Sequence, residues 1–123
     1  MKFQSLRPIL WTDKLEESIQ FYTAVLGFSL DEKNEDWGWA SLSKDGVEIM
    51  MAKPNEHMAF EKPLFTGSFY INTNNVEEVW QTLKDKATIV YDIETFEWQM
   101  REFAIYDNNG YIIQFGQDVS AMI

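Results

Sequence analysis

The sequence contains no cysteine, a single histidine and only ten basic residues among its 123 positions. Without cysteine the chain forms no disulfide and offers no thiolate for catalysis or metal binding. No apolar run approaches the roughly 20 residues that a membrane-spanning helix requires. The segment that begins at Met1 lacks the apolar stretch and cleavage site of a secretory signal. These absences predict a cytoplasmic protein that does not bind membranes.

Acidic residues outnumber basic residues by 20 to 10, which gives a net charge of -10. Such a surface repels nucleic acid, so we expect no nucleic-acid partner. It attracts cationic small molecules, although solubility alone also accounts for the charge. Aromatic residues make up 15% of the chain and include five tryptophans. A chain of this length rarely buries so many rings, so some should lie at a surface or a site.

The two halves of the sequence resemble each other. The segment from Ile9 matches the segment from Tyr70, 61 residues later, in a threonine, a Glu-Glu pair, a glutamine and several apolar positions. The segment from Trp39 matches the segment from Phe103, 64 residues later, in an alanine and a glycine. A repeat of about half the chain predicts the tandem duplication of one supersecondary unit.

Each half is predicted to fold in the order βαβββ. The expected strands lie at about 6–11, 27–32, 36–43 and 46–52, and then at about 67–73, 88–94, 100–106 and 111–116. Two capping boxes, Asp13 with Glu16 and Asn75 with Glu78, predict the starts of the two helices. Gly27 is expected to end the first helix in a left-handed conformation. The expected buried faces are Leu15, Ile19, Tyr22 and Leu26, and Val76, Val79, Trp80 and Leu83.

The fold class is therefore α+β, with two tandem βαβββ modules in one domain. The first module spans about 1–52, the linker about 53–66 and the second module about 67–123. One helix covers one face of each sheet, so the other face is left bare. Two such sheets side by side would form a cupped mixed sheet with the helices on its outer face. In the last strand Gln114 alternates with apolar neighbours, so we expect it to point into the cup.

Two segments carry a family resemblance: PILWTDKLEESIQFYTAVLGF and REFAIYDNNGYIIQFGQ. Together they resemble the vicinal oxygen chelate superfamily, which includes glyoxalases, bleomycin-resistance proteins and extradiol dioxygenases. The resemblance covers essentially the whole chain. It implies the paired modules of the glyoxalase/bleomycin resistance fold and a homodimer with ligand sites in clefts.

Metal-dependent members of that superfamily carry ligands, commonly His or Glu, on the first and last strand of each module. The resemblance places these positions at Arg7, Met50, Ser68 and Gln114. Arginine stays protonated and is no ligand, methionine is soft and neutral, and serine and glutamine are weak donors. The one histidine, His57, lies in the linker. We therefore expect no metal and no other cofactor, with Gln114 either hydrogen-bonding a ligand or filling the cup.

Within the superfamily the chain is most similar to bleomycin-resistance proteins, which sequester a drug without transforming it. The resemblance rests on Pro8 in the first strand and on the segments EDWGWASL and FEWQMREFAIYDNNG. It implies a planar cationic ligand held between aromatic rings in a cleft between two subunits. Trp37 and Trp98 match the stacking aromatics by position.

The spacing of the tryptophans also indicates possible roles for them. Trp37 and Trp39 lie two apart on one predicted strand, so both should point to the same face. They form either a stacking wall for a ligand or a packing surface for the helix or a partner subunit. Trp98 has Glu94, Glu97 and Glu102 nearby in the sequence, a setting that suits a planar cation. Its alternative role is packing at an interface or loop.

The remaining candidates are cations and apolar residues. Arg7 is expected to hold an anionic group of the ligand or to pair with Glu48, and Arg101 has the same two possible roles. Met50 would provide an adaptable apolar surface. Phe60, in the linker, is expected to fold down as a lid or dimer contact. The predicted ligand-binding set is Trp37, Trp39, Met50, Phe60, Trp98, Arg101, Gln114 and Arg7, with no catalytic residue.

These observations favour a metal-free protein that sequesters a small molecule, possibly cationic and aromatic, as a homodimer. A second hypothesis is a lyase, isomerase or dioxygenase of the same superfamily that uses Gln114 with Glu48 or Glu102. A third is a domain without a ligand that acts as an interaction partner.

Overall fold

The computed structural model describes residues 1–54 and 60–122 of the chain. His57 lies outside the described residues. The chain divides after Pro63 into two compact units. None of the helices in the described parts is long and apolar enough to span a bilayer.

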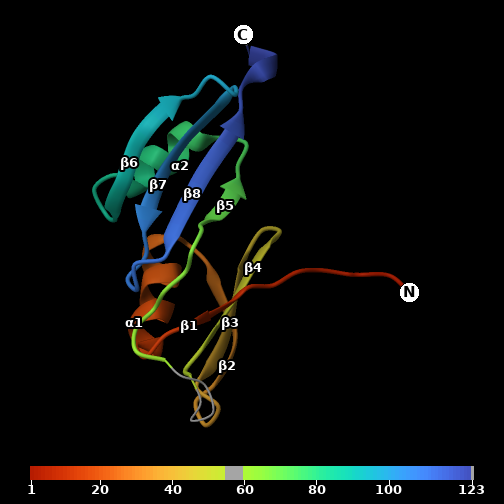
Figure 1. Ribbon diagram of the computed structural model, residues 1–123, viewed down its shortest axis with the longest axis vertical. Coiled ribbons are helices and arrows are strands. Elements are labelled where there is room, and N and C mark those ends of the chain that lie inside the picture. The colour runs from red at the N-terminus through yellow and green to blue at the C-terminus, as the bar shows by residue number, and fades with distance from the viewer. Residues whose placement is uncertain (55–59, 123) are drawn as a thin grey trace. The chain divides into compact units, whose positions relative to one another are not determined.

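The first unit is a four-stranded sheet with a helix on one face (Figure 1). Its elements are β1 (Ile9–Trp11), α1 (Leu15–Gln20), the π-helical turn η1 (Phe21–Val25), β2 (Ser29–Asn34), β3 (Trp39–Lys44) and β4 (Val47–Ala52). The strand order is β1-β4-β3-β2. β1 runs parallel to β4, and the other pairs are antiparallel.

The second unit repeats this arrangement. Its elements are β5 (Phe69–Asn72), α2 (Val76–Leu83), β6 (Thr88–Thr95), β7 (Met100–Tyr106), β8 (Ile112–Asp118) and the short 3-10 helix η2 (Ser120–Met122). The strand order is β5-β8-β7-β6, with β5 parallel to β8. In Figure 1 α2 lies against one face of these strands. The predicted α+β class and the doubled βαβββ order are confirmed.

Each unit has its own core between helix and sheet. In the first unit the predicted helix stripe is buried, and so are Leu10, Leu42, Ile49 and Met51 of the sheet. In the second unit Val76 and Leu83 are buried, while the Trp80 ring meets the Phe103 ring edge-on at 5.1 Å. Each fully buried aliphatic or aromatic side chain contributes about 1.5–3 kcal/mol of transfer free energy, so these two layers carry most of the stability.

The two helices begin in different ways. Asn75 caps α2 as predicted, because its Oδ1 accepts a hydrogen bond from the Glu78 N–H at 3.1 Å. The capping box predicted for Asp13 is wrong. The residue before α1 is Lys14, whose N–H donates to Thr12 Oγ1 at 2.9 Å. Thr12 is fully buried beside Ser18, with their hydroxyl oxygens 3.2 Å apart. A buried hydroxyl therefore organises this helix start.

The end of the first helix follows the prediction. Gly27 adopts a left-handed conformation with φ +79°. The Phe28 N–H then donates to the Tyr22 carbonyl at 2.9 Å, and the Leu26 N–H donates to the Phe21 carbonyl at 3.2 Å. These two bonds satisfy carbonyls that the helix end would otherwise leave unpaired.

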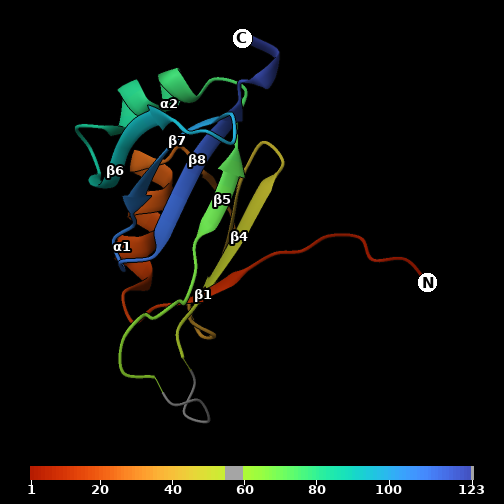
Figure 2. The same ribbon diagram turned by 45° about the horizontal axis from the view of Figure 1, so that its top comes forward.

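Several strands begin later than predicted, and the shift is largest, at three residues, for β1 and β3. Residues 1–8 lead into β1 without regular secondary structure (Figure 2). β3 begins at Trp39, and Trp37 lies in the preceding turn, where it is 75% exposed. Gly38 has φ +62°, which interrupts the extended backbone between them. The prediction that Trp37 and Trp39 share a strand is therefore wrong.

Candidate ligand-binding site

The face of the second sheet that α2 leaves open carries a row of polar and aromatic side chains. Tyr70 pairs in register with Gln114, Gln114 with Ala104, and Ala104 with Tyr91. In the next row Glu102 is opposite Gly116. The phenylalanines at the α2 interface belong to the other side of the same strands, so the predicted alternation around Gln114 is confirmed.

A chain of hydrogen bonds joins these side chains. Glu102 is only 4% exposed, and its two carboxylate oxygens accept from different tyrosines. The Tyr70 hydroxyl donates to Oε2 at 2.5 Å, and the Tyr91 hydroxyl donates to Oε1 at 3.2 Å. Gln114 Nε2 donates to the Tyr91 oxygen at 2.9 Å, and the Ser68 hydroxyl donates to Gln114 Oε1. The buried carboxylate is therefore satisfied by neutral donors.

The two tyrosine hydroxyls are held in their neutral form. Loss of solvent raises the pKa of Tyr70, and its hydrogen bond to Glu102 adds to the rise. Loss of solvent also raises the pKa of Tyr91, with a further contribution from the charge of Glu102, while the hydrogen bond from Gln114 acts in the opposite direction. A phenolate next to a carboxylate would be a repelled pair of like charges. Both groups therefore remain hydrogen-bond donors over a wide pH range.

A pocket of about 630 Å³ opens beside this chain of hydrogen bonds. Its lining residues are Tyr91, Asp92, Ile93, Glu94, Phe96, Trp98, Glu102 and Gln114. Three of the eight are acidic and none is basic. The pocket therefore combines aromatic surface with an environment that favours positive charge.

The aromatic side of the pocket is a connected series of rings. The Trp98 and Phe96 rings stack with their centroids 4.7 Å apart and an interplanar angle of 6°. Phe96 then meets the Tyr91 ring edge-on at 5.9 Å and 88°. Both stacked and edge-to-face pairs are favourable geometries, so the rings support one another's positions.

The backbone places these rings through a tight turn and irregular pairing. In the turn between β6 and β7 the Phe96 N–H donates to the Met100 carbonyl and the Gln99 N–H to the Phe96 carbonyl, each at 2.9 Å. Gln99 adopts φ +65° there, and Trp98 is 58% exposed. The register of β6 against β7 also shifts on both sides of Tyr91. Such bulges bend a strand and redirect its side chains, which is common next to sites.

Several predicted residues meet in this pocket. Trp98 and Gln114 line it together, and Glu94 and Glu102 supply the expected carboxylates. Glu97 is not among the lining residues. The sequence reasoning missed five contributors: Tyr70, which bonds to Glu102, and the lining residues Tyr91, Asp92, Ile93 and Phe96. Alternation along strand 67–73 would have placed Tyr70 on the same face as Ser68, whereas the bulges hide the orientation of Tyr91.

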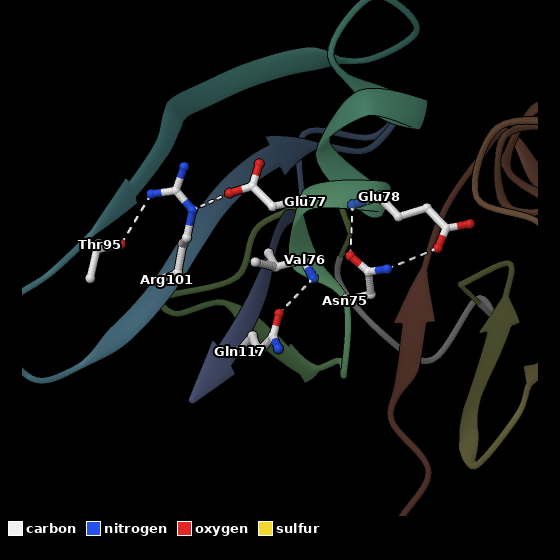
Figure 3. Close-up of polar contacts among 7 residues, drawn as sticks. All are labelled: Asn75, Val76, Glu77, Glu78, Thr95, Arg101 and Gln117. Atoms are coloured by element: carbon white, nitrogen blue, oxygen red, sulfur yellow. Dashed lines mark hydrogen bonds and ion pairs between the residues drawn. The ribbon is translucent and has the colours of Figure 1, made fainter. Parts of the chain in front are cut away.

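Arg101 does not belong to this face, and it is not among the residues that line the pocket. It lies on the α2 side of β7, and Figure 3 shows its guanidinium group directed at Glu77 of α2. Its Nε donates to Glu77 Oε1 and its Nη1 donates to Thr95 Oγ1 at 3.0 Å. Arg101 therefore tethers the first turn of α2 to β6 and β7, which is the ion-pair role that the sequence left open.

The first turn of α2 has a second tether to the sheet. Gln117 Oε1 accepts a hydrogen bond from the Val76 N–H at 3.0 Å (Figure 3). Because the first N–H groups of a helix have no intrahelical partner, this bond satisfies a donor that would otherwise lack one.

Arg7, in the first unit, has the partner that was predicted for it. Arg7 Nε lies 3.7 Å from Glu48 Oε2, and both side chains are about half exposed. Met50 lies two residues beyond Glu48 on β4 and is paired with Ile9 and Ser41 on the strands beside it. Arg7 therefore has the ion-pair partner that was one of its two predicted roles.

The open face of the first sheet also carries aromatic residues. Trp39 and Trp11 pair in register with Ala52 from its two sides. The Phe60 ring lies 6.3 Å from the Trp11 ring in an edge-on arrangement, so Phe60 folds onto this unit. Trp11 is a residue that the sequence reasoning missed, although its position two after Ile9 places it on the open face.

The residues at the superfamily's metal-ligand positions do not fit a divalent metal. In the second unit the Ser68 hydroxyl is committed to Gln114, whose amide is in turn committed to Tyr91. In the first unit the positions hold Met50 and an arginine paired with Glu48. The described residues contain no group of three or more His, Asp or Glu side chains placed to hold a metal ion. Neutral donors that already hydrogen-bond one another make a poor site for Zn²⁺ or Fe²⁺.

Solved structures resemble the chain over nearly its whole length. A glyoxalase/bleomycin resistance protein/dioxygenase from Nocardioides is 16% identical with a TM-score of 0.78, covering 98% of this chain and 87% of that one. TioX from Micromonospora sp. ML1 is 16% identical with a TM-score of 0.75, covering 94% and 99%. Lactoylglutathione lyase from Agrobacterium tumefaciens is 14% identical with a TM-score of 0.74, covering 93% and 92%.

At these identities the structural matches show a shared fold. No curated protein matches the chain. A family model does match it, over residues 4–115 and so across both βαβββ units. The chain therefore belongs to the Glyoxalase/Bleomycin resistance protein/Dioxygenase superfamily.

Proposed function

We propose that this protein is a metal-free small-molecule binding protein that holds a planar cation in the pocket of its second module. The observation that carries the proposal is the composition of that pocket: aromatic rings in contact with one another, three carboxylates and no basic side chain. The ligand would be sequestered, as in bleomycin-resistance proteins, and not transformed.

The physical case rests on two favourable terms that act on the same ligand. A flat ring placed against Trp98 gains stacking energy of about 0.5–1.5 kcal/mol beyond the area that it buries. A positive charge gains attraction both from the aromatic faces and from the carboxylates of Asp92, Glu94 and Glu102. A neutral or anionic planar ligand gains only the stacking energy. Planar cations should therefore bind more tightly than neutral or anionic planar molecules of the same size.

The hydrogen bonds of the site favour binding over catalysis. The superfamily also contains enzymes, and an activity would need Gln114 or Glu102 to act on a substrate. Both oxygens of Glu102 accept from tyrosines, and the Gln114 amide bridges Ser68 and Tyr91. Side chains held in this way are suited to shaping a pocket wall.

The homodimer belongs to the same proposal. Its support is the exposure of large apolar side chains at the start of the chain, with Phe3 at 89% and Leu6 at 92%. Surface of this kind commonly marks a contact with another chain. Analytical ultracentrifugation tests it directly, and a monomer at micromolar concentration would contradict this part of the proposal.

The ligand proposal is tested by titrating the purified protein with aminoacridine, a planar cation. Binding is measured by tryptophan fluorescence and by isothermal titration calorimetry. Trp98→Ala should weaken binding about tenfold, which is the loss of a stacking contact together with a cation–π contact. Addition of a chelator should leave the affinity unchanged.

Trp37→Ala is the matched control, because Trp37 is also exposed and lies on the corresponding turn of the first module. It is not among the residues that line the pocket, so affinity should stay within about twofold of wild type. An equal loss in both variants would extend the site to the first module. Full affinity in Trp98→Ala, or a stoichiometric bound metal, would refute the proposal.

A further inference from the structure

The hydrogen-bond chain of the second module has a direction, and Glu102 sets it. A carboxylate has no hydrogen to donate, so the hydroxyls of Tyr70 and Tyr91 must both donate to it. The Tyr91 hydroxyl has one hydrogen, and Glu102 takes it. Toward Gln114 the Tyr91 oxygen can therefore only accept.

This constraint fixes the orientation of the Gln114 amide. The NH2 group, and not the carbonyl, must face Tyr91, in agreement with the 2.9 Å contact from Nε2. The carbonyl oxygen then faces Ser68, whose hydroxyl donates to it. The chain runs from Ser68 through Gln114 and Tyr91 to Glu102, and every link donates in the same direction. A reversal of the amide would place its carbonyl oxygen against the Tyr91 oxygen, two acceptors with no hydrogen between them, because the Tyr91 hydrogen is donated to Glu102.

One donor of this chain is left over. The Gln114 NH2 group has two hydrogens, and Tyr91 accepts only one of them. The second has no hydrogen-bond partner among residues 1–54 and 60–122, and Gln114 lines the pocket. A ligand that covered this N–H without accepting from it would incur the cost of an unsatisfied donor, whereas one with an acceptor would gain a hydrogen bond.

We infer that Glu102, acting through Tyr91, holds the Gln114 amide as a hydrogen-bond donor toward the pocket, so that the ligand is a planar cation with a carbonyl-type acceptor on its ring system. This inference rests on the proposed function and narrows it. Gln114 is the residue that recognises the acceptor, because its second side-chain N–H would donate a hydrogen bond to it. Glu102 and Tyr91 are positioning residues for Gln114, and Glu102 also contributes charge.

The first test compares two cations that differ only in the acceptor: aminomethyl anthraquinone, with ring carbonyls, and aminomethyl anthracene, without them. The wild-type protein should bind the quinone about five- to tenfold more tightly, as one net hydrogen bond implies. Tyr91→Phe keeps the ring but removes the hydroxyl, so the preference should fall to about twofold or less. Glu102→Gln should weaken both cations because a charge is lost, and it should also abolish the preference.

Glu97→Gln is the matched control. It removes one negative charge close to Trp98 but from a residue outside the pocket lining, so the preference for the quinone should remain. If the wild-type protein binds both cations equally, or if Tyr91→Phe keeps the full preference, the inference is overturned while the proposed function stands. If neither cation binds, both are overturned.

A second test needs no ligand. In the wild-type protein the Gln114 side-chain NH2 protons should give nuclear Overhauser effects to the Tyr91 ring. In Glu102→Gln the new amide can donate to Tyr91, which frees the Tyr91 hydroxyl to donate to Gln114, and the NH2 protons should then approach Ser68. NH2 protons that lie beside Ser68 in the wild type would overturn the inference. Tyr91→Phe serves the ligand test if Glu102→Gln does not fold.

Discussion

The Tyr70 side chain lies across Gly116, with its hydroxyl oxygen 1.8 Å from the position that a Cβ atom on Gly116 would occupy. Real Cβ atoms do not approach other atoms so closely, so this strand position requires glycine for reasons of space. The glycine lets the tyrosine ring pass over β8 and reach Glu102 on the neighbouring strand. A residue without a side chain thus makes possible the burial of a charged one.

Gly116→Ala should therefore displace Tyr70 and remove one of the two donors to the Glu102 carboxylate. We expect a loss of about 1–3 kcal/mol in the free energy of unfolding, the usual cost of an unsatisfied buried polar group. Urea unfolding measures it. Gly46→Ala is the control, because nothing lies within 4 Å of a Cβ there. If Gly116→Ala and wild type have the same free energy of unfolding, Tyr70 does not require glycine at position 116 in order to reach Glu102.

Arg101→Met should affect stability and leave ligand binding intact. The Arg101 and Glu77 side chains are 31% and 53% exposed, so their ion pair is worth only about 0.2–1 kcal/mol. Thermal unfolding should report a loss of that size, and Glu77→Gln should reproduce it. Aminoacridine affinity should stay within twofold of wild type in both variants. A large loss of affinity in Arg101→Met would restore the ligand role that the sequence suggested.

Alanine substitutions at the starts of α1 and α2 should differ in their effect on the free energy of unfolding. Asn75→Ala removes a side-chain cap and should cost about 1 kcal/mol. Asp13→Ala should change the free energy of unfolding by less than about 0.5 kcal/mol, because Asp13 makes no cap. Chemical denaturation of the two variants side by side gives the comparison. If Asp13→Ala cost as much as Asn75→Ala, the capping box of the first helix would be real.

Stability should depend on Tyr70 at alkaline pH. Because the pKa of Tyr70 is raised in the folded state, the unfolded chain releases this proton first as pH rises. The stabilisation is complete below about pH 10, the ordinary tyrosine pKa, and is lost as pH rises toward the folded-state value. Tyr70→Phe should therefore lose stability less steeply above about pH 10 than wild type.

Urea unfolding across that pH range tests the dependence. Tyr106→Phe is the matched control, since Tyr70 and Tyr106 are both 39% exposed but only Tyr70 bonds to Glu102. The control should follow the wild-type curve. Parallel curves for Tyr70→Phe and wild type would contradict the expected linkage.

Much of the fold was predictable because the periodic spacing of apolar residues directly reflects helices and strands. The apolar stripes of the helices and the alternation around Gln114 identified the element order and the buried faces. Alternation also predicts which side a residue takes, but Arg101 was proposed as a ligand contact because of its charge, with no face assigned to it. Its neighbour Glu102 lies on the open face, so strict alternation would have placed Arg101 on the side of α2.

The site was less predictable, because cross-strand register is not encoded locally. The repeat aligned Trp39 with Phe103, but the structure pairs Trp39 with Ala52 and Glu102 with Gly116. Ala52 and Gly116 are 64 residues apart and their partners 63, so the two hairpins differ by one residue in register. A slip of one residue exchanges the two faces of a strand. The tyrosine–carboxylate chain could not be deduced without that register.

The separation of helix side and open side within each unit has a consequence for how such a protein can change. Hydrophobic packing lies on one side of the strands, so positions on the other side that do not support the buried Glu102 can change at little cost in stability. Positions 68 and 114 can therefore exchange coordinating groups for hydroxyl and amide groups while the scaffold stays intact. A duplicated architecture of this kind allows residues of the open faces to change while the helix-covered faces, and with them the fold, are kept.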